Sequence, residues 1–544
     1  MKLVTISEMH SIEKEADGNG LTYEMMMENA GHNLSKEVLQ LAYDQDDEED
    51  IQVLGLVGPG NNGGDTLVAL THLAEKGWKA RAYLVKRKTG GDPLVKRLEN
   101  AQGEIYQSEK DSNFQQLTVF LETADVVLDG VLGTGFKQPM KPEIGKVLGT
   151  IKTILATIEC KPFIVAVDCP SGVDCDSGAA DANCIPADAT ITLAAVKQGM
   201  LKTPAFDLIG ELNVVGIGQI EELQSWQSIK NEVANKDLAV FLLPKRPSDA
   251  YKGTFGTAMV VAGSVNYPGA ALLAGKAAYR IGTGLVTLAV PGPVHVALAG
   301  QLPEATWLIL PHEMGSIASG ASEVLINNLE RSTALLVGPG LGVEDTTREF
   351  VANMLAGDPA KASKEHMGFV QISKTKTRQK PATLPPLIVD ADGLKLLSKI
   401  PDWFKRLPAP AILTPHPGEM SVLTGLTIDA IQKDRLNVAI KYAAEWGHVV
   451  VLKGAFTVVA APDGKTTTIS VASSALAHAG SGDVLAGLIT GLRAQGMEPY
   501  DAARLGAWIH AQAGLAAAAV QGTEISVLAG DVLEAVADVI AQLK

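Results

Sequence analysis

The stretch Ala479-Gly480-Ser481-Gly482-Asp483-Val484-Leu485-Ala486-Gly487 lies near the C-terminus and organises the rest of the chain. Its small residues allow a tight turn and leave backbone N–H groups free where a helix begins, which makes an anion-binding site. Asp483 falls in the first turn of that helix. A carboxylate there would repel a bound phosphate, but it can take a proton from a hydroxyl that is about to be phosphorylated. The plain alternative is a glycine turn with Asp483 as an ordinary helix N-cap.

Composition limits the possible functions. A chain of 544 residues is expected to hold two to four domains. Its net charge of −15 argues against a nucleic-acid-binding protein. No apolar run reaches the ~18–20 residues of a membrane span. The first residues, Met1 to Glu8, turn polar before a signal-peptide core could form, so we expect a cytoplasmic enzyme without membrane partners.

A glycine-rich loop follows residues 51–57, which we expect to be a strand, and residues 9–41 before it show helical spacing. The loop reads Gly58-Pro59-Gly60-Asn61-Asn62-Gly63-Gly64-Asp65 and leads into a helical pattern. Strand, glycine loop and helix in this order is the phosphate-binding arrangement of doubly wound sheets. The loop is not a Walker loop, and its two asparagines offer oxygens to a cation or a ligand.

Two further predicted strands end in an aspartate, Asp129 and Asp168, each followed by a glycine-containing loop. Ligands bind at the carboxyl ends of strands in open α/β sheets, so we expect these loops to converge on one pocket. We expect another strand over residues 190–197, ending in Lys197. A lone lysine is usually a surface charge, but opposite Asp168 it is a candidate for proton transfer.

The first half resembles a known family. The motifs P-G-N-N-G-G-D, L-D-G-V-L-G-T-G, V-D-C-P-S-G and V-K-Q-G follow M-E-N-A-G in this order. Together they resemble the NAD(P)H-hydrate epimerase domain, the YjeF N-terminal family, with Thr66 as a small departure from the expected glycine. The resemblance implies a K⁺ ion held by Asn62, Asp129 and Ser171. It also implies that the hydrated nicotinamide nucleotide contacts the glycine loops and the strand-end aspartate, namely Asn61, Asn62, Gly63, Gly64, Asp65, Gly133, Thr134, Gly135, Phe136, Lys137, Gln138, Pro139 and Asp168. Catalysis at C6 needs proton transfer, for which Asp168 and Lys197 are the candidates.

The second half again alternates strands and helices, which predicts a layered α/β domain. G-P-G-L-G, D-A-D-G-L, L-T-P-H-P-G-E-M, V-L-K-G-A and G-S-G-D-V-L-A-G follow one another from residue 338 to residue 487. They resemble the ribokinase-like, ADP-dependent NAD(P)H-hydrate dehydratases. The resemblance implies that Ala270, Gly340, His416 and Asp483 contact the hydrate. It implies that the adenine nucleotide contacts a second set, namely Lys453, Gly454, Ala455, Phe456, Thr457 and Gly482.

The implied chemistry fits these residues. Asp483 would deprotonate the C6 hydroxyl of the hydrate, which attacks the β-phosphate of ADP, while the amides of the G-S-G turn stabilise the transferred group. Loss of phosphate then restores NADH or NADPH and leaves AMP. Asp390 and Glu419 are candidates for outer-sphere binding of the Mg²⁺ that accompanies ADP.

Two parts of the second half depart from the family pattern. Residues 469–474 stand where an N-P-T-G-N-like run is expected, and Ala479 stands where glycine is expected, which leaves the choice between ADP and ATP open. The Lys- and Arg-rich insert 358–386 is interpreted as a long surface loop or, alternatively, as a basic flap over an anionic ligand.

The sequence thus predicts a Rossmann-like, doubly wound epimerase domain over residues 1–220, a linker over 221–242 and a ribokinase-like α/β dehydratase domain over 243–544. Such a chain would act on NAD(P)H hydrate and ADP, with K⁺ and Mg²⁺ as cofactors, and we expect it to form a homo-oligomer. One alternative is a ribokinase-like kinase of a small hydroxymethyl vitamin precursor fused to a nucleotide-binding module. Another makes the N-terminal half a nucleotide sensor without catalytic activity.

Overall fold

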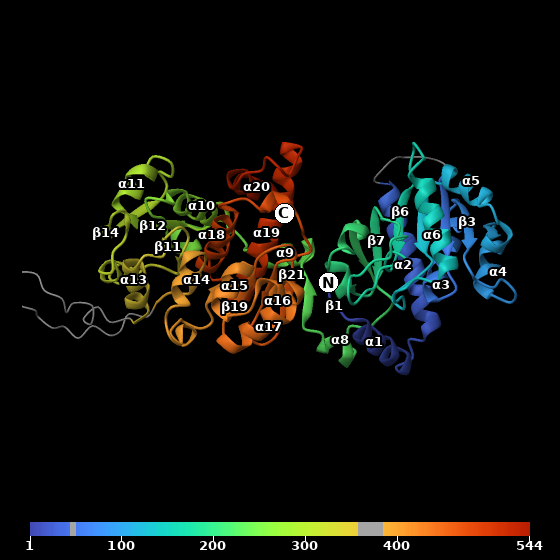
Figure 1. Ribbon diagram of the computed structural model, residues 1–544, viewed down its shortest axis with the longest axis horizontal. Coiled ribbons are helices and arrows are strands. Elements are labelled where there is room, and N and C mark those ends of the chain that lie inside the picture. The colour runs from blue at the N-terminus through green and yellow to red at the C-terminus, as the bar shows by residue number, and fades with distance from the viewer. Residues whose placement is uncertain (44–49, 357–383) are drawn as a thin grey trace, which may run out of the picture. The chain divides into compact units, whose positions relative to one another are not determined.

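The computed structural model describes residues 1–43, 50–356 and 384–544, and the chain divides into two compact units, Met1–Asn231 and Glu232–Lys544 (Figure 1). The division falls inside the predicted linker 221–242, which contains α8 (Gln224–Ser228), β10 (Asn231–Val233) and α9 (Lys236–Leu242). Most of the basic insert, residues 357–383, lies outside the described residues, so its interpretation as a loop or a flap stays a prediction.

The first unit is built on a seven-stranded parallel sheet with the order β4-β3-β2-β5-β6-β7-β9. A separate two-stranded parallel sheet joins β1 to β8. The strands are β1 (Leu3–Val4), β2 (Gln52–Val57), β3 (Lys79–Leu84), β4 (Glu104–Gln107), β5 (Val126–Gly130), β6 (Phe163–Val167), β7 (Ala189–Leu193), β8 (Val196–Lys197) and β9 (Glu211–Val215). Besides α8, the helices are α1 (Ile6–Gly18), α2 (Tyr23–Tyr43), α3 (Asn61–Glu75), α4 (Pro93–Asn100), α5 (Gln115–Thr123), α6 (Pro142–Leu155) and α7 (Phe206–Ile209).

Helices cover both faces of this sheet. One apolar core packs α2, α3 and α4 against the sheet, and a second core packs α5 and α6 against the opposite face. The strand order reverses its direction between β2 and β5, and ligands bind at such a switch point in doubly wound sheets. The predicted Rossmann-like class is therefore confirmed for this unit. The two loops that leave the switch point are the asparagine loop after β2 and the glycine loop after β5.

Two local predictions for this unit were wrong. The helical pattern over residues 9–41 forms two helices, because Gly20 takes a positive φ of 96° between α1 and α2. The strand expected over 190–197 breaks at Ala194, whose φ is 63°, so that β7 and β8 belong to different sheets. The break turns the chain back on itself, and it brings Lys197 over the end of β7.

The second unit contains a ten-stranded sheet with the order β10-β21-β20-β19-β18-β17-β16-β11-β12-β13, in which the strands from β19 to β13 are parallel. Besides β10, these strands are β11 (Thr257–Val261), β12 (Leu285–Pro291), β13 (Thr306–Leu310), β16 (Ala334–Val337), β17 (Leu387–Val389), β18 (Ile412–Leu413), β19 (Val449–Leu452), β20 (Val458–Ala460) and β21 (Thr466–Thr468). A hairpin pairs β14 (His312–Glu313) with β15 (Ser316–Ile317).

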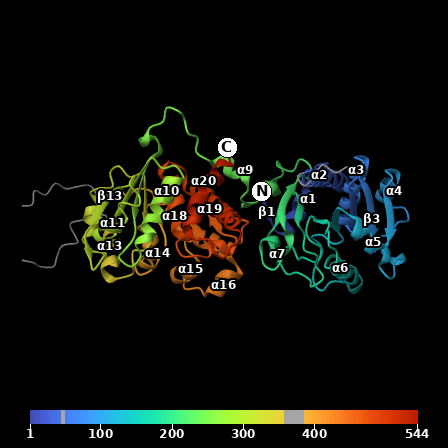
Figure 2. The ribbon, with the colours of Figure 1, turned by 90° about the horizontal axis from the view of Figure 1, so that it is seen from above.

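Helices again cover both faces: one apolar core contains residues of α10, α18 and α19, and a second contains residues of α13, α14 and α15, all labelled in Figure 2. Besides α9, the helices are α10 (Pro268–Arg280), α11 (Gly292–Leu298), α12 (Ala321–Ile326), α13 (Asp345–Ala356), α14 (Asp392–Leu397), α15 (Pro417–Thr424), α16 (Ile428–Lys433), α17 (Arg435–Trp446), α18 (Ser481–Ala494), α19 (Pro499–Gln521) and α20 (Ala529–Ala541). The predicted α/β class is confirmed for this unit as well.

The opening motif forms the start of α18, which packs against α10. A Cβ on Gly487 would lie 2.3 Å from the backbone oxygen of Ala274, so this glycine permits the close approach of the two helices. Within the described residues, none of the helices has the length and apolar character needed to cross a membrane.

Candidate active sites

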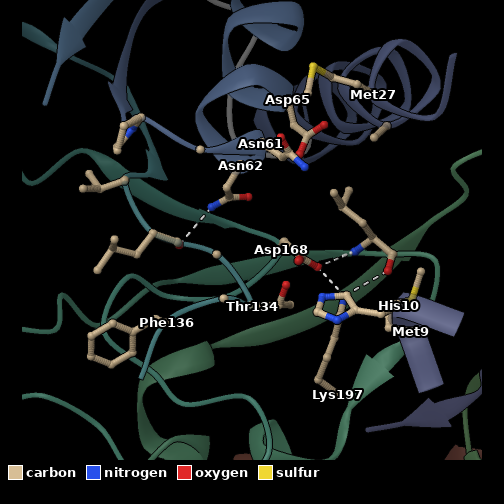
Figure 3. A pocket seen from close by; sticks show the side chains of 18 of the residues that line it. Met9, His10, Met27, Asn61, Asn62, Asp65, Thr134, Phe136, Asp168 and Lys197 are labelled. Atoms are coloured by element: carbon tan, nitrogen blue, oxygen red, sulfur yellow. Dashed lines mark hydrogen bonds and ion pairs between the residues drawn. The ribbon is translucent and has the colours of Figure 1, made fainter. Parts of the chain in front are cut away.

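A cavity of about 650 Å³ lies at the switch point of the first unit. Most of the residues predicted to contact the nucleotide line it, namely Asn61, Asn62, Asp65, Gly133, Thr134, Gly135, Phe136, Lys137, Pro139 and Asp168 (Figure 3). Gly63, Gly64 and Gln138 are not among the lining residues. A Cβ on Gly63 would lie 2.1 Å from the Gly58 oxygen, so this glycine serves the close packing of the loop.

Asp168 and Lys197 form a buried ion pair in this cavity. Lys197 is 1% exposed, and its ammonium group donates to Asp168, to Thr192 Oγ1 at 2.8 Å and to Leu193 O at 2.9 Å. Asp168 Oδ1 also accepts from Thr192 Oγ1 and from Leu193 N, both at 3.0 Å. Asp168 has a φ of 63°, a strained backbone that such a network can hold in place.

Two other carboxyl groups face this pair inside the cavity. Asp65, at the start of α3, is 6% exposed, and burial raises the pKa of its carboxyl group well above the usual range. The negative charges of Asp168 and Glu13 raise that pKa further. Glu13 on α1 also lines the cavity, and burial raises its pKa too. The cavity therefore combines one ion-paired carboxylate with two carboxyl groups that hold their protons more tightly than usual.

The predicted K⁺ ligands come together beside the cavity. Ser171 Oγ donates to Asp129 Oδ1 at 2.6 Å, and Asn62 Nδ2 donates to Leu132 O at 3.0 Å. Asn62 Oδ1 is buried without a hydrogen-bond partner. Asp129 is fully buried, and among the described residues no lysine or arginine forms an ion pair with it. An unpaired carboxylate and an orphaned amide oxygen in one place fit a monovalent cation.

A second acidic cluster lies at the carboxyl ends of β17, β18 and β19 in the second unit. Asp390, which follows β17, is 1% exposed and accepts from Lys453 Nζ at 2.5 Å and from Thr414 Oγ1 at 2.7 Å. Lys453 Nζ also lies 3.7 Å from Glu419 Oε2. Asp390 Oδ2 is buried and has no hydrogen-bond partner. Lys453 thus offsets one of the two negative charges, and Asp390 Oδ2 is left without a hydrogen-bond partner.

His416 is the N-cap of α15. Its Nδ1 accepts from the backbone N–H groups of Gly418 and Glu419, at 3.0 and 3.3 Å. Glu419 accepts in return from the His416 backbone N–H at 2.9 Å, which completes a capping box. The Nε2 edge lies 3.3 Å from Glu419 Oε1. Burial lowers the pKa of His416, and these contacts fix its ring beside the acidic cluster.

Asp483 faces the same cluster from the start of α18. Burial raises the pKa of its carboxyl group to about 7, with the charge of Asp390 as the next contribution. A Cβ built on Gly482 would lie 3.3 Å from Lys453 Nζ and 4.0 Å from Asp390 Oδ2, so the turn passes directly over the lysine–aspartate pair. Gly480 has a φ of 91°, as the tight turn requires.

The remaining predicted residues of this unit form two groups. A Cβ on Gly340 would lie 2.9 Å from the Cβ of Ala270, so these two predicted hydrate contacts are neighbours. The predicted nucleotide contacts form a turn after β19, in which Gly454 and Phe456 have positive φ values of 136° and 55°. Thr457 Oγ1 donates to Gly454 O at 2.9 Å and closes this turn.

The segment that departs from the family pattern is tied to the loop after α19. The Ser473 hydroxyl donates to Glu524 Oε1 at 3.0 Å, and the Ser474 backbone N–H donates to Glu524 Oε2 at the same distance. The Ser474 hydroxyl makes a further hydrogen bond to this carboxylate. These serines are therefore engaged in holding the loop.

Comparisons with known proteins agree with the motifs. Residues 258–537 match the family described as NAD(P)H-hydrate dehydratase, and residues 23–199 match the YjeF-related protein N-terminus. A protein of Moorella thermoacetica named bifunctional NAD(P)H-hydrate repair enzyme Nnr is 35% identical, over 98% of this chain and 96% of its own length. The chain belongs to the bifunctional NAD(P)H-hydrate repair enzyme family.

Other members of this repair enzyme family cover the chain at similar identity. The Escherichia coli protein of the same name is 32% identical, over 94% of this chain and 88% of its own length. Among solved structures, an ADP/ATP-dependent NAD(P)H-hydrate dehydratase from Bacillus subtilis is 29% identical, over 57% of this chain and 99% of its own, with a TM-score of 0.47.

Sequence reasoning missed several residues that build these sites. Thr192 and Thr414 hydrogen-bond the two lysine-paired aspartates. Their position at or near strand ends could have indicated this role. His510 on α19 lies 3.0 Å from Ser481 Oγ under the glycine turn, and no sequence signal relates these residues. Glu13 was also missed, although its spacing of four from Met9 on α1 places both on one helix face.

The ion pair in the first unit predicts a stability effect. Replacing Lys197 by Met leaves Asp168 as an uncompensated buried charge, which costs about 3–5 kcal/mol of local stability. Hydrogen exchange measured by mass spectrometry over β6 and β7 should show this loss. The double variant D168N/K197M should lose much less of this local stability. Lys161→Met, at an exposed position, should leave the hydrogen-exchange protection of β6 and β7 unchanged. Unchanged protection in K197M would show that the pair does not stabilise the fold.

Proposed function

We propose that the first unit interconverts the R and S forms of NAD(P)H hydrate at C6. The second unit uses ADP to dehydrate the S form, which gives NADH or NADPH, AMP and phosphate. The single observation that carries this proposal is the position of Asp483. It lies in the first turn of α18, directly after Gly482, which passes over the Lys453–Asp390 pair, and its pKa is raised to about 7. A base with this pKa is half ionised near neutral pH, which suits proton abstraction from a hydroxyl group.

Each step of the dehydration has a group in the second unit. Ala270, Gly340 and His416 hold the hydrate so that its C6 hydroxyl faces Asp483. Asp483 takes the hydroxyl proton, and the oxygen attacks the β-phosphate of ADP. The free N–H groups at the start of α18, with Gly482 among them, stabilise charge on the transferred phosphoryl group. Expulsion of phosphate from C6 and loss of a proton from C5 then form the C5–C6 double bond, which completes the reaction.

The nucleotide lies along the turn after β19. The backbone of Lys453 to Thr457 contacts the adenine nucleotide, and the positive φ angles of this turn expose its peptide groups. The Lys453 side chain has a different task, because it ion-pairs Asp390 and approaches Glu419. The Ser473 and Ser474 hydroxyls are hydrogen-bonded to Glu524, and we propose ADP as the donor.

Mg²⁺ fits the acidic cluster only together with the nucleotide. Among the residues that the structure describes, no three His, Cys, Asp or Glu side chains are grouped to hold a metal ion. Mg²⁺ usually binds one or two carboxylates together with substrate phosphates. The free Asp390 Oδ2 is such a carboxylate oxygen, with Glu419 as the second candidate. Bound there, Mg²⁺ would offset the charge of the ADP phosphates.

In the first unit, Asp168 is the base and Lys197 is the counter-ion that holds it in place. Asn62, Asp129 and Ser171 would hold K⁺, which supplies positive charge beside the anionic substrate. The Asn61–Asp65 loop and the 133–139 loop position the nucleotide, with Gly63 and Gly64 serving the shape of the first loop. A mere sensor would not need a strained, ion-paired aspartate inside its cavity.

The kinase of a vitamin precursor is the weaker alternative, because the relatives that cover 94% or more of this chain in the comparisons above are named repair enzymes. The proposed reactants are the small molecules NAD(P)H hydrate and ADP. We further propose a homo-oligomer that works in the cytoplasm. Size-exclusion chromatography with light scattering tests the assembly, and a monomeric mass would refute it.

The recovery of reduced-nicotinamide absorbance from a mixed R/S hydrate tests the two activities. With ADP and Mg²⁺ we expect complete recovery, faster than spontaneous epimerisation permits. Recovery that stops at the S fraction would leave only the dehydratase. ATP should give a slower reaction than ADP, and EDTA should slow both. No recovery with either nucleotide would favour the small-molecule kinase.

The pH dependence of dehydration follows from Asp483. Only its ionised form accepts a proton, so kcat/KM should rise with pH, reach half of its maximum near pH 7 and level off above it. One pH unit below the midpoint, kcat/KM should be about tenfold lower than on the plateau. Asp483→Asn should abolish dehydration, while the exposed Asp345→Asn should keep the wild-type profile. A pH-independent rate in the wild type would refute this role.

The K⁺ site makes a separate prediction. Replacing Ser171 by Ala removes one oxygen ligand, so half-maximal epimerisation should need about 10–100-fold more K⁺. KCl should also raise the melting temperature of the wild type more than LiCl does, and this difference should shrink in S171A. Ser108→Ala serves as the control. Equal responses of the wild type and S171A to K⁺ would exclude the site.

A further inference from the structure

Helix α1 is anchored against the Asp168–Lys197 pair. Strand β1 pairs in parallel with β8, and Val4 lies opposite Lys197 in this register. Thr5 then caps α1 through a capping box with Glu8. A strand and a capped helix fix where α1 begins, so the side chains on its first turns have set positions relative to Lys197.

One face of α1 forms part of the epimerase cavity. Met9, His10 and Glu13 all line it, and Figure 3 shows Met9 and His10 among the side chains around the cavity. Met9 and Glu13 are four residues apart, which places them on the same face of the helix. The residues that match the YjeF-related family, 23–199, do not include α1.

All three N–H donors of Lys197 are used in hydrogen bonds within the protein. An ammonium group has three N–H donors, and Lys197 directs them to Asp168, Thr192 Oγ1 and Leu193 O. Lys197 therefore holds Asp168 in place through an ion pair, but it has no donor left for a substrate. A reaction that needs a base and an acid must take its acid from another residue.

The environment of the Glu13 carboxyl group suits it to act as this acid. Burial raises the pKa of its carboxyl group. The charged groups that face it are His10 on its own helix, and Asp168 and Lys197 from the sheet. Asp65 on α3 also faces Glu13, and the positive charge of Arg87 offsets part of the rise in the pKa of Asp65. Within the described residues the Glu13 carboxyl makes no hydrogen bond or ion pair to the protein, so it is free to meet a ligand in the cavity.

We propose that Glu13 is a catalytic residue of the epimerase, which donates and recovers a proton at the ring nitrogen, while Asp168 takes and returns the proton of the C6 hydroxyl. This inference rests on the epimerase function proposed above.

The protons and electrons of this reaction balance. Asp168 takes the proton of the C6 hydroxyl, the C6–N1 bond breaks with its electrons moving to N1, and Glu13 gives N1 a proton. The products are an aldehyde at C6 and a ring-opened enamine. Rotation about the C5–C6 bond presents the other face of the aldehyde. N1 attacks that face and returns its proton to Glu13, while the oxygen recovers the proton held by Asp168.

Asp65 is the competing donor. It is more deeply buried than Glu13 and lies at the start of α3 beside the asparagine loop. The distinction is open to experiment because Glu13→Gln removes the proposed acid, keeps the side-chain size and leaves Asp65 intact.

The test uses the full-length protein and the purified R hydrate, with S formation followed by chromatography and corrected for the spontaneous rate. Glu13→Gln should lower kcat for epimerisation by about 10²–10⁴-fold with little change in KM. The wild-type kcat/KM should fall at high pH as Glu13 loses its proton, and this fall should vanish in E13Q. Glu13→Asp should keep the fall with an intermediate rate. Glu24→Gln, at an exposed position on α2, should behave as the wild type.

Several outcomes would overturn the inference. They are a wild-type kcat in E13Q, and a loss carried by KM alone with an unchanged pH profile. If hydrogen exchange shows that E13Q fails to fold, E13D decides, and a wild-type rate in folded E13D overturns the inference. ADP-dependent dehydration of the S hydrate should be unchanged in every variant. If the wild type itself does not accelerate epimerisation, the proposed function of the first unit fails, which is distinct from a failure of Glu13.

Discussion

Parallel pairing of buried strands is the constraint on which both units depend. It makes the strands end at the same edge of a sheet, and each crossover helix then begins at that edge with its free N–H groups. Polar residues that follow different strands are thereby brought close together in space, although they lie far apart in the sequence. The asparagine loop after β2 and the glycine loop after β5 meet in this way, and so do the groups that follow β17, β18 and β19.

The two units stabilise their central aspartates in the same manner. Asp168 is held by Lys197 and Thr192, and Asp390 is held by Lys453 and Thr414. A carboxylate in the interior is costly unless it is paired and hydrogen-bonded. In both cases the lysine and the threonine come from other strands or strand ends than the aspartate, so the pair forms only when the sheet is assembled.

The sites differ in how they handle protons. In the second unit a partly buried carboxyl group, Asp483, stands near a neutralised pair and titrates near neutral pH. In the first unit the pair itself reaches the cavity, and two further carboxyl groups with raised pKa values surround it. A phosphorylation needs one base, whereas an epimerisation that opens and closes a ring needs a base and an acid. The raised pKa values of Asp65 and Glu13 beside the Asp168–Lys197 pair fit the reaction proposed for the first unit.

The sequence by itself determined the α/β class, the doubly wound first half and most of the loops that line the cavity, because glycine loops and strand-end acids have short-range signatures. It did not determine the break at Ala194, which separates β7 from β8 and folds Lys197 back onto Asp168. Nor did it relate α1 to the site, since that placement depends on Val4 pairing beside Lys197. Contacts between residues nearly 200 positions apart depend on packing and strand pairing, and only the tertiary structure decides them.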